Sequence, residues 1–268
     1  MPLAVCLVAA ALAITTLMAA VLALSVRSRN WSIIDIAWGL GFVAVAVTSH
    51  LVSTGHGDPG RRLIALLVPV VWGVRLAAYI FWRNHGKPED PRYTALMRRR
   101  TGPLIPYVVR TIFWPQGWVL WVVAIPISVA MCERSGVNAL TWLGVALAAV
   151  GLVFEALGDL QLARFKSDPN NAGKLLDRGL WSWTRHPNYF GDLCVMFSFW
   201  LIACGSWFGV LTVFAPILMT RMLITKTGKQ MLDRRLARTR GDAYIAYAAR
   251  TSGLFPRPPR KDVATKVR

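Results

Sequence analysis

The sequence predicts an all-α membrane protein, a bundle of seven transmembrane helices with the N-terminus outside and the C-terminus in the cytoplasm. Of its 268 residues, 55% are hydrophobic and only 16% are charged, whereas soluble domains carry about 25% charged residues. The apolar residues gather into runs of about 18 or more, the length that crosses roughly 30 Å of hydrocarbon. These runs fill the chain nearly end to end, so residues 1–268 are expected to form a single integral membrane domain.

Seven apolar runs are expected to span the bilayer, and most of the gaps between them contain glycine or proline. The first run lacks a preceding basic segment and is longer than a signal-peptide core usually is, so we interpret it as a spanning helix. The last two runs are short, and Gly205-Ser206 between them predicts a tight hairpin. The predicted spans are residues 3–26, 32–53, 62–82, 108–131, 138–161, 190–205 and 207–224, followed by a basic cytoplasmic tail over 225–268.

The distribution of basic residues predicts the orientation. With seven spans, 27 of the 31 lysines and arginines fall on one side, in the first loop, the third loop extended to Arg110, the fifth loop and the tail counted from Arg221 onward. Cytoplasmic loops carry this excess, which predicts a multi-pass protein with these loops and the tail in the cytoplasm. The net charge of +18 is explained in the same way, so no nucleic-acid partner is expected. The four cysteines and four histidines lack ligand spacing, so we expect neither a metal site nor a disulfide framework.

Five ionisable side chains inside the predicted spans are candidates for function, because such groups are costly in a bilayer. Glu155 and Asp159 are four residues apart, which places both on one helix face. Arg75 and Tyr79 share a face in the same way, and Asp35 with Arg75 is a candidate structural pair. The five are Asp35, Arg75, Glu155, Asp159 and Asp192.

The segment 174–192 alternates polar and aromatic residues before a span begins. Pro187 suits the first turn of a helix, whose free N–H groups and positive dipole end attract anions. With Arg185 and His186 beside it, this helix start is expected to hold a phosphate or carboxylate group of a ligand. An interfacial belt of tryptophans with arginine anchors would have a similar pattern.

The tail holds many basic residues before Tyr244 and Tyr247. One interpretation is an amphipathic helix that lies on anionic membrane lipid. The other is a cap that closes over a polyanionic cofactor.

Four stretches resemble the steroid 5-alpha-reductase superfamily, and above all its broadly distributed bacterial branch. The first stretch is Gly179-Leu-Trp-Ser-Trp-Thr-Arg-His-Pro-Asn-Tyr-Phe-Gly-Asp192. The other three are Ser32-Ile-Ile-Asp-Ile-Ala-Trp-Gly-Leu-Gly-Phe42, Glu89-Asp-Pro-Arg-Tyr93, and Arg250-Thr-Ser-Gly-Leu-Phe-Pro256 with Pro258-Pro259-Arg260. The core Arg-His-Pro-x-Tyr has a counterpart in the isoprenylcysteine carboxyl methyltransferases. The four stretches together are the more specific signal.

The resemblance implies a seven-helix bundle in a bacterial inner (cell) membrane that binds NADPH from the cytoplasmic side. It implies a reductase that transfers hydride to the β carbon of an enone in a steroid-like or other lipid substrate. By position in the motifs, Asn188 and Asp192 correspond to contacts on the nicotinamide side. The remaining residues expected at the cofactor are Glu155, Asp159, Arg164, Lys166, Arg185, His186, Tyr189, Arg235, Tyr244 and Tyr247.

Catalysis by such a reductase needs a donor that polarises the enone carbonyl. Tyr79 or a protonated Asp35 is expected in that role, with Arg75 beside them. The steroid enzymes place a Gln-Glu pair near the carbonyl, whereas Asp35 is the one acid of the second span here. This difference from the steroid enzymes bears on whether the substrate is a steroid more than on whether the protein binds NADPH. A hydrophobic small molecule is expected to enter from the bilayer.

Two other functions remain open from the sequence. The first is an S-adenosylmethionine-dependent membrane methyltransferase. Such enzymes tend to carry a Glu-rich segment after the last hairpin, where this chain has Lys226, Lys229 and Gln230. The second is a non-enzymatic membrane protein whose buried charges form structural pairs.

Overall fold

The computed structural model describes residues 2–225 and 228–259. Lys226 and Arg260, which the sequence analysis uses, lie outside these ranges. The described chain is helical, and its one extended pairing is an isolated bridge between Thr184 and Ser252. The chain forms two compact units, Met1–Val145 with Phe199–Ala215, and Ala146–Ser198 with Pro216–Arg268. The expectation of a single membrane domain stays a prediction.

Six helical segments of the described chain are long and apolar enough to cross a membrane, which confirms the all-α class and is consistent with a multi-pass membrane protein. They are Pro2–Ser28, Trp31–Val52, Pro59–Asn84, Leu104–Cys132, Ala139–Ser167 and Trp207–Arg240. The predicted span 190–205 corresponds to helix α9, Pro187–Ala203, which has 17 residues, slightly fewer than the roughly 20 that a span needs. Seven spans and the orientation of the termini therefore stay predictions.

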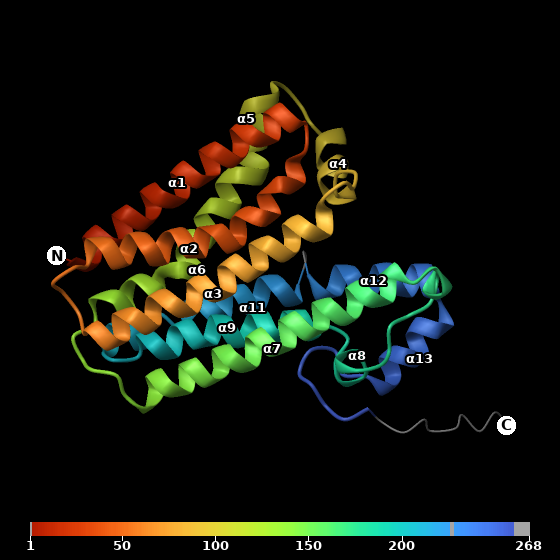
Figure 1. Cartoon of the computed structure of the whole chain (residues 1–268). Coiled ribbons are helices and arrows are strands. Elements are labelled where there is room, and N and C mark those ends of the chain that lie inside the picture. Colours follow the sequence, from red (N-terminus) through yellow and green to blue (C-terminus); the bar gives the residue numbers. More distant parts are fainter. Residues whose placement is uncertain (1, 226–227, 260–268) are drawn as a thin grey trace. The chain divides into compact units, whose positions relative to one another are not determined.

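The first unit contains the N-terminal helices of the chain (Figure 1). Its helices are α1 (Pro2–Ser28), α2 (Ile34–Val52), α3 (Pro59–Asn84), α4 (Pro91–Arg98), α5 (Leu104–Val108), α6 (Trp114–Cys132) and α10 (Trp207–Leu211). A 3₁₀ turn over Trp31–Ile33 precedes α2, and a π-helical turn over Val109–Phe113 joins α5 to α6. Asp58 and Asp90 accept hydrogen bonds from backbone N–H groups at the starts of α3 and α4, each followed by a proline. These caps explain why the two helices begin where they do.

Small residues let α2 and α3 approach closely. A Cβ atom on Gly39 would lie 2.3 Å from the carbonyl oxygen of Gly73, so the two backbones touch there. Such small-residue contacts are the usual way in which membrane helices pack. Further along, the rings of Phe42, Trp72 and Phe199 meet with centroids 5.1 to 5.9 Å apart. The first unit is therefore held by glycine contacts and an aromatic core.

Arg61 is fully buried at the start of α3. Its guanidinium donates to the carbonyl oxygens of Ser135, Gly136 and Ile202, at 3.1, 2.7 and 2.6 Å. One side chain thus ties the loop after α6 to the end of α9. A buried guanidinium is tolerated here because its donors are satisfied.

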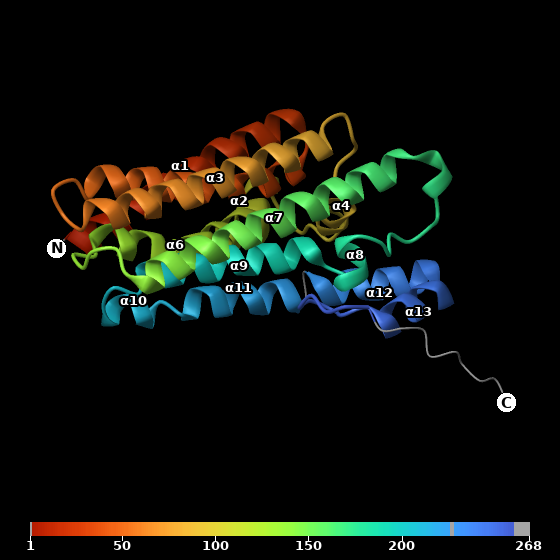
Figure 2. The same ribbon diagram turned by 60° about the horizontal axis from the view of Figure 1, so that its bottom comes forward.

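The second unit contains α8 (Leu180–Trp183), α12 (Lys229–Arg240) and α13 (Asp242–Arg250), and a short 3₁₀ turn over Pro169–Asn171. Helices α7 (Ala139–Ser167), α9 and α11 (Phe214–Ile224) contribute residues to both units. The predicted span 207–224 is interrupted, since α10 ends at Leu211 and α11 begins at Phe214. Helices α12 and α13 lie side by side (Figure 2).

Within the second unit, α7 and α9 cross at two glycines. A Cβ atom on Gly151 or on Gly191 would lie 2.6 Å from the other residue's carbonyl oxygen. At 1.5 Å per residue, the 29 residues of α7 extend over roughly 43 Å. That exceeds the hydrocarbon thickness, so α7 is longer than one crossing of a bilayer requires.

Candidate functional site

The start of α9 is fixed by the segment before it. Gly179 has a positive φ of 62°, which favours glycine, and the next backbone N–H, that of Leu180, donates to Gln161 on α7. The short helix α8 follows, and the indole of Trp181 donates to the carbonyl oxygen of Gly158 at 3.0 Å. Thr184 is extended and Pro187 is the first residue of α9. The predicted helix start at Pro187 is confirmed.

The tail runs along this segment. The N–H of Arg185 donates to the carbonyl oxygen of Ser252 at 2.9 Å, and the N–H of Arg257 donates to that of Trp183 at 3.1 Å. The Thr184 hydroxyl donates to the carbonyl oxygen of Leu254 at 2.8 Å. Backbone groups of the tail are therefore hydrogen-bonded to residues 183–185, and the tail is docked there, as its interpretation as a cap requires.

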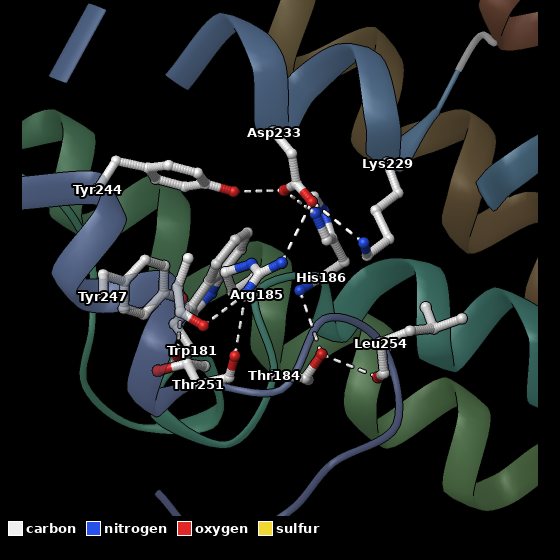
Figure 3. A network of polar contacts seen from close by, with 11 residues as sticks. Trp181, Thr184, Arg185, His186, Lys229, Asp233, Tyr244, Tyr247, Thr251 and Leu254 are labelled. Atoms are coloured by element: carbon white, nitrogen blue, oxygen red, sulfur yellow. Dashed lines mark hydrogen bonds and ion pairs between the residues drawn. The ribbon is translucent and has the colours of Figure 1, made fainter. Parts of the chain in front are cut away.

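Asp233 on α12 is the centre of a polar cluster at the start of α9 (Figure 3). Its carboxylate lies 2.8 Å from Nε2 of His186, 3.3 Å from Arg185 and 3.1 Å from Lys229, and it also accepts from the hydroxyl of Tyr244. Burial alone would raise the pKa of the Asp233 carboxyl. The hydrogen bonds from His186, Tyr244 and Lys229 outweigh burial and hold the pKa well below its usual range.

Two predicted cofactor residues help to hold this cluster together. Arg185 donates through one terminal nitrogen to the carbonyl oxygens of Ala248 and Thr251, both at 3.0 Å. The Tyr247 hydroxyl donates to the carbonyl oxygen of Trp181 at 2.6 Å. In this arrangement both side chains fix the tail, and their contact with a cofactor stays a prediction.

One buried nitrogen of the cluster, Nδ1 of His186, has no hydrogen-bond partner among the described residues. Because ionised Asp233 can only accept hydrogen bonds, Nε2 of His186 carries the proton between them. His186 is 1% exposed, and no protein group in the described ranges bonds its Nδ1 atom. The ring of Tyr189 stacks on the imidazole, with centroids 5.2 Å apart. The histidine is thus fixed in place with a free ring nitrogen.

The other predicted cofactor residues of the second unit lie in several places. Glu155 and Asp159 are buried, and Asn188 and Asp192 are partly buried near the start of α9. Arg164 lines a hollow of about 370 Å³ at the end of α7, together with Arg178. Arg235 lines a separate hollow with Arg234 and Arg238, and Lys166 is exposed.

A further hollow of about 290 Å³ adjoins Arg185. Arg250 and Arg257 also line it, with the backbone of residues 251–253. Three arginines along one hollow favour an anionic ligand such as a phosphate, although the guanidinium of Arg250 also pairs with Asp177. The sequence analysis missed Arg257 as a candidate, although it lies beside the motif that ends at Pro256.

The predicted catalytic residues lie in the first unit. Asp35 accepts a hydrogen bond of 2.6 Å from the hydroxyl of Tyr93 and an ion-pair contact of 2.8 Å from Arg92. The expected pairing of Asp35 with Arg75 is therefore wrong, because α4 folds over the start of α2 and supplies both partners. Arg75 instead lies over the ring of Tyr79, at 5.4 Å.

Two residues of these contacts, Asp233 and Tyr93, were not predicted from the sequence, although each stands in a distinctive sequence context. Asp233 is the one acid between Lys226 and Arg240, in a segment otherwise rich in cations. A lone carboxylate among so many cations is expected to be a shared partner. Tyr93 ends the stretch Glu89–Tyr93, which the sequence analysis quotes for its resemblance without assigning it a role.

The chain was compared with known families and proteins. Residues 21–251 match the family described as protein of unknown function DUF1295. A similar protein is an uncharacterised protein of Schizosaccharomyces pombe, 25% identical over 262 residues, which cover 87% of this chain and 74% of the relative. No solved structure matches the chain significantly. Because the family match extends over most of its length, this protein belongs to the DUF1295 family.

Proposed function

We propose that this protein is an NADPH-dependent membrane reductase of an activated carbon–carbon double bond in a steroid-like or other lipid substrate. Its membership of the DUF1295 family and its resemblance to the steroid 5-alpha-reductase superfamily support this function. The observation that carries the proposal is the cluster around Asp233. There the Arg185-His186-Pro187 motif and the tail, far apart in sequence, fold together at the start of one helix.

The groups at this cluster suit a dinucleotide. The free Nδ1 atom of His186 is a buried acceptor for a hydroxyl or amide donor. Arg185, Arg250 and Arg257 surround a hollow that suits phosphate. The first turn of α9 adds backbone N–H groups and a positive dipole end. Residues of this chain would therefore hold both the ribose side and the phosphate side of NADPH.

When bound, NADPH would supply the hydride. The chain must then polarise the substrate carbonyl while negative charge grows on its oxygen. Tyr93 suits this role because burial, reinforced by the Asp35 carboxylate, raises the pKa of its phenol. The phenol therefore stays protonated, and it would polarise the carbonyl by moving its single O–H from Asp35 to the substrate oxygen. Tyr79, with Arg75 and Arg83 over its ring, is the second candidate donor.

A lipid substrate is consistent with the apolar hollow between α1 and α6. Its volume is about 390 Å³, and its walls include Met18, Phe113, Trp114, Trp118 and Trp121. A hollow of this character accepts a hydrophobic molecule from the surrounding bilayer. As part of the proposal, the chain crosses a bacterial inner membrane seven times, with α9 as the sixth span and the tail in the cytoplasm.

The test is ligand binding to the purified protein in detergent. NADPH, NADH and S-adenosylmethionine are titrated separately, and NADPH oxidation is followed with a set of hydrophobic enones. We expect NADPH to bind more tightly than NADH, because it carries one more phosphate. Its affinity should fall as salt rises, since exposed ion pairs are screened. Binding of S-adenosylmethionine without NADPH would replace the proposal with a methyltransferase, and binding of neither would indicate a non-enzymatic protein.

A further inference from the structure

Two thiols meet in the first unit, and neither takes part in the proposed reaction; only their placement outside the cell rests on the proposed topology. Sγ of Cys6 on α1 lies 3.3 Å from Sγ of Cys132, the last residue of α6, although 126 positions separate them in the chain. All four cysteines are free. Within residues 2–225 and 228–259, no thiol contact is found for Cys194 or Cys204. The pair is thus a specific juxtaposition.

The surroundings of the pair are small and polar. Cys6 is fully buried and its thiol donates weakly to the carbonyl oxygen of Ser49, at 3.8 Å. The Ser49 hydroxyl bonds that of Ser128, one turn before Cys132 on α6, at 2.9 Å. No bulky side chain separates the sulfurs. To reach the disulfide length of about 2.05 Å they must approach by roughly 1.3 Å.

We propose that Cys6 and Cys132 form a reversible disulfide that joins α1 to the end of α6. Two thiols lose two protons and two electrons as one S–S bond forms, and a disulfide-bearing oxidant is reduced to two thiols. Cys132 is partly exposed, whereas Cys6 is buried, so Cys132 attacks the oxidant first and forms a mixed disulfide. Cys6 then attacks the Cys132 sulfur and releases the second thiol of the oxidant.

The consequence is a covalent tie between the two helices that border the apolar hollow. Trp121 on α6 already donates its indole N–H to the carbonyl oxygen of Leu7, beside Cys6, at 3.0 Å. The disulfide would fix this end of the α1–α6 contact and leave the rest of the hollow unchanged. In the proposed topology this end faces outside the cell, where disulfides persist.

The test uses a parent chain with Cys194→Ser and Cys204→Ser, so that only the pair remains. The reduced protein, folded in detergent, is incubated with glutathione disulfide and analysed by intact mass. We expect a loss of two hydrogens, with no retained glutathione, and a higher melting temperature that a reductant reverses. In Cys6→Ser we expect a stable glutathione adduct on Cys132, and in Cys132→Ser no change.

Two outcomes of the oxidation experiment overturn the proposal. One is an adduct that persists on Cys132 in the parent chain, and the other is a parent chain in which neither sulfur reacts. A melting curve of each variant before oxidation shows that it is folded. In cells quenched with acid and then alkylated, the peptides with Cys6 and Cys132 should be joined. Alkylated thiols on both peptides would show that the bond does not form in the cell, which also counts against it.

Discussion

The hydroxyl of Tyr93 donates a hydrogen bond of 2.6 Å to Oδ1 of Asp35, across 58 positions of sequence. The contact joins α4 to the first turn of α2, and Arg92 binds the other carboxylate oxygen at 2.8 Å. Tyr93 is 6% exposed. The one proton of this buried phenol is bound to the carboxylate, so in the proposed reaction the hydrogen bond would move from Asp35 to the substrate carbonyl.

Tyr93→Phe should slow hydride transfer in single-turnover experiments and leave NADPH affinity nearly unchanged. The lost donor no longer stabilises the growing negative charge, and removal of one such donor costs roughly 100- to 1,000-fold in rate in other enzymes. Tyr107→Phe is the matched control, because its hydroxyl donates to a backbone carbonyl oxygen of Leu96 instead. Equal rates for Tyr93→Phe and the wild type would assign Tyr93 a structural role, and Tyr79→Phe would then be the next variant to measure.

Asn188→Ala should weaken NADPH binding without unfolding the protein. Loss of a hydrogen bond that leaves a partner unpaired in a dry site costs about 1–3 kcal/mol. That corresponds to roughly 5- to 150-fold in affinity. Asn170→Ala, at an exposed position, is the control and should bind normally. Unchanged affinity in a folded Asn188→Ala protein would remove this residue from the cofactor site.

Asp233→Asn should detach the tail from the start of α9. The carboxylate receives charged hydrogen bonds from Arg185 and Lys229, and such bonds contribute about 1.5–3 kcal/mol each. We therefore expect a lower melting temperature, faster proteolysis in the tail and weaker NADPH binding. Asp242→Asn, which changes an exposed acid of the same tail, should have little effect. Equal stability of Asp233→Asn and the wild type would contradict this account.

The difference in folding stability between the wild type and Asp233→Asn, called here the advantage of the wild type, should also depend on pH. The folded pKa of Asp233 lies below its usual value, so the native state binds the proton less readily than the unfolded state does. The advantage is fully present above the unfolded pKa of about 3.9. It is lost as the pH falls further towards the folded pKa. Melting curves of both proteins from neutral pH to below pH 4 measure this difference, and a gap that widens at low pH would be the wrong sign.

Arg61→Leu should reduce the yield of folded protein. The substitution leaves the carbonyl oxygens of Ser135, Gly136 and Ile202 without their donor in a buried site. Unsatisfied buried groups cost roughly 1–3 kcal/mol each. Arg134→Leu, at an exposed position of the neighbouring loop, is the control. Size-exclusion profiles and melting curves in detergent compare the two, and similar profiles would show that the carbonyl groups find other donors.

Reporter fusions should place the N-terminus outside and the tail in the cytoplasm. We expect cytoplasmic signals at Val26, Gly102, Lys174 and Arg260, and external signals at Thr54 and Ser135. The reason is the bias of 27 of 31 basic residues to one side. Cytoplasmic signals at both Thr54 and Ser135 would overturn the topology and, with it, the count of seven spans.

The sequence by itself determined an all-helical chain with segments apolar enough to cross a membrane, and the approximate limits of five long helices. It also predicted that Arg185 and His186 precede a helix beginning at Pro187. Both follow from local physics: apolar length reports the hydrocarbon thickness, and proline is tolerated in a first helical turn. For the tail, the pattern of basic and aromatic residues left two interpretations open, a helix on anionic lipid and a cap over a cofactor.

Only the tertiary structure decided the partners. It paired Asp35 with Arg92 and Tyr93 rather than Arg75, and it placed Asp233 against His186. It also brought Cys6 to Cys132. Side-chain contacts between elements distant in sequence depend on how the helices pack, and a one-dimensional pattern specifies the faces of each helix but not which faces meet. That is why the sequence indicated the type of site, and the fold selected the residues that meet there.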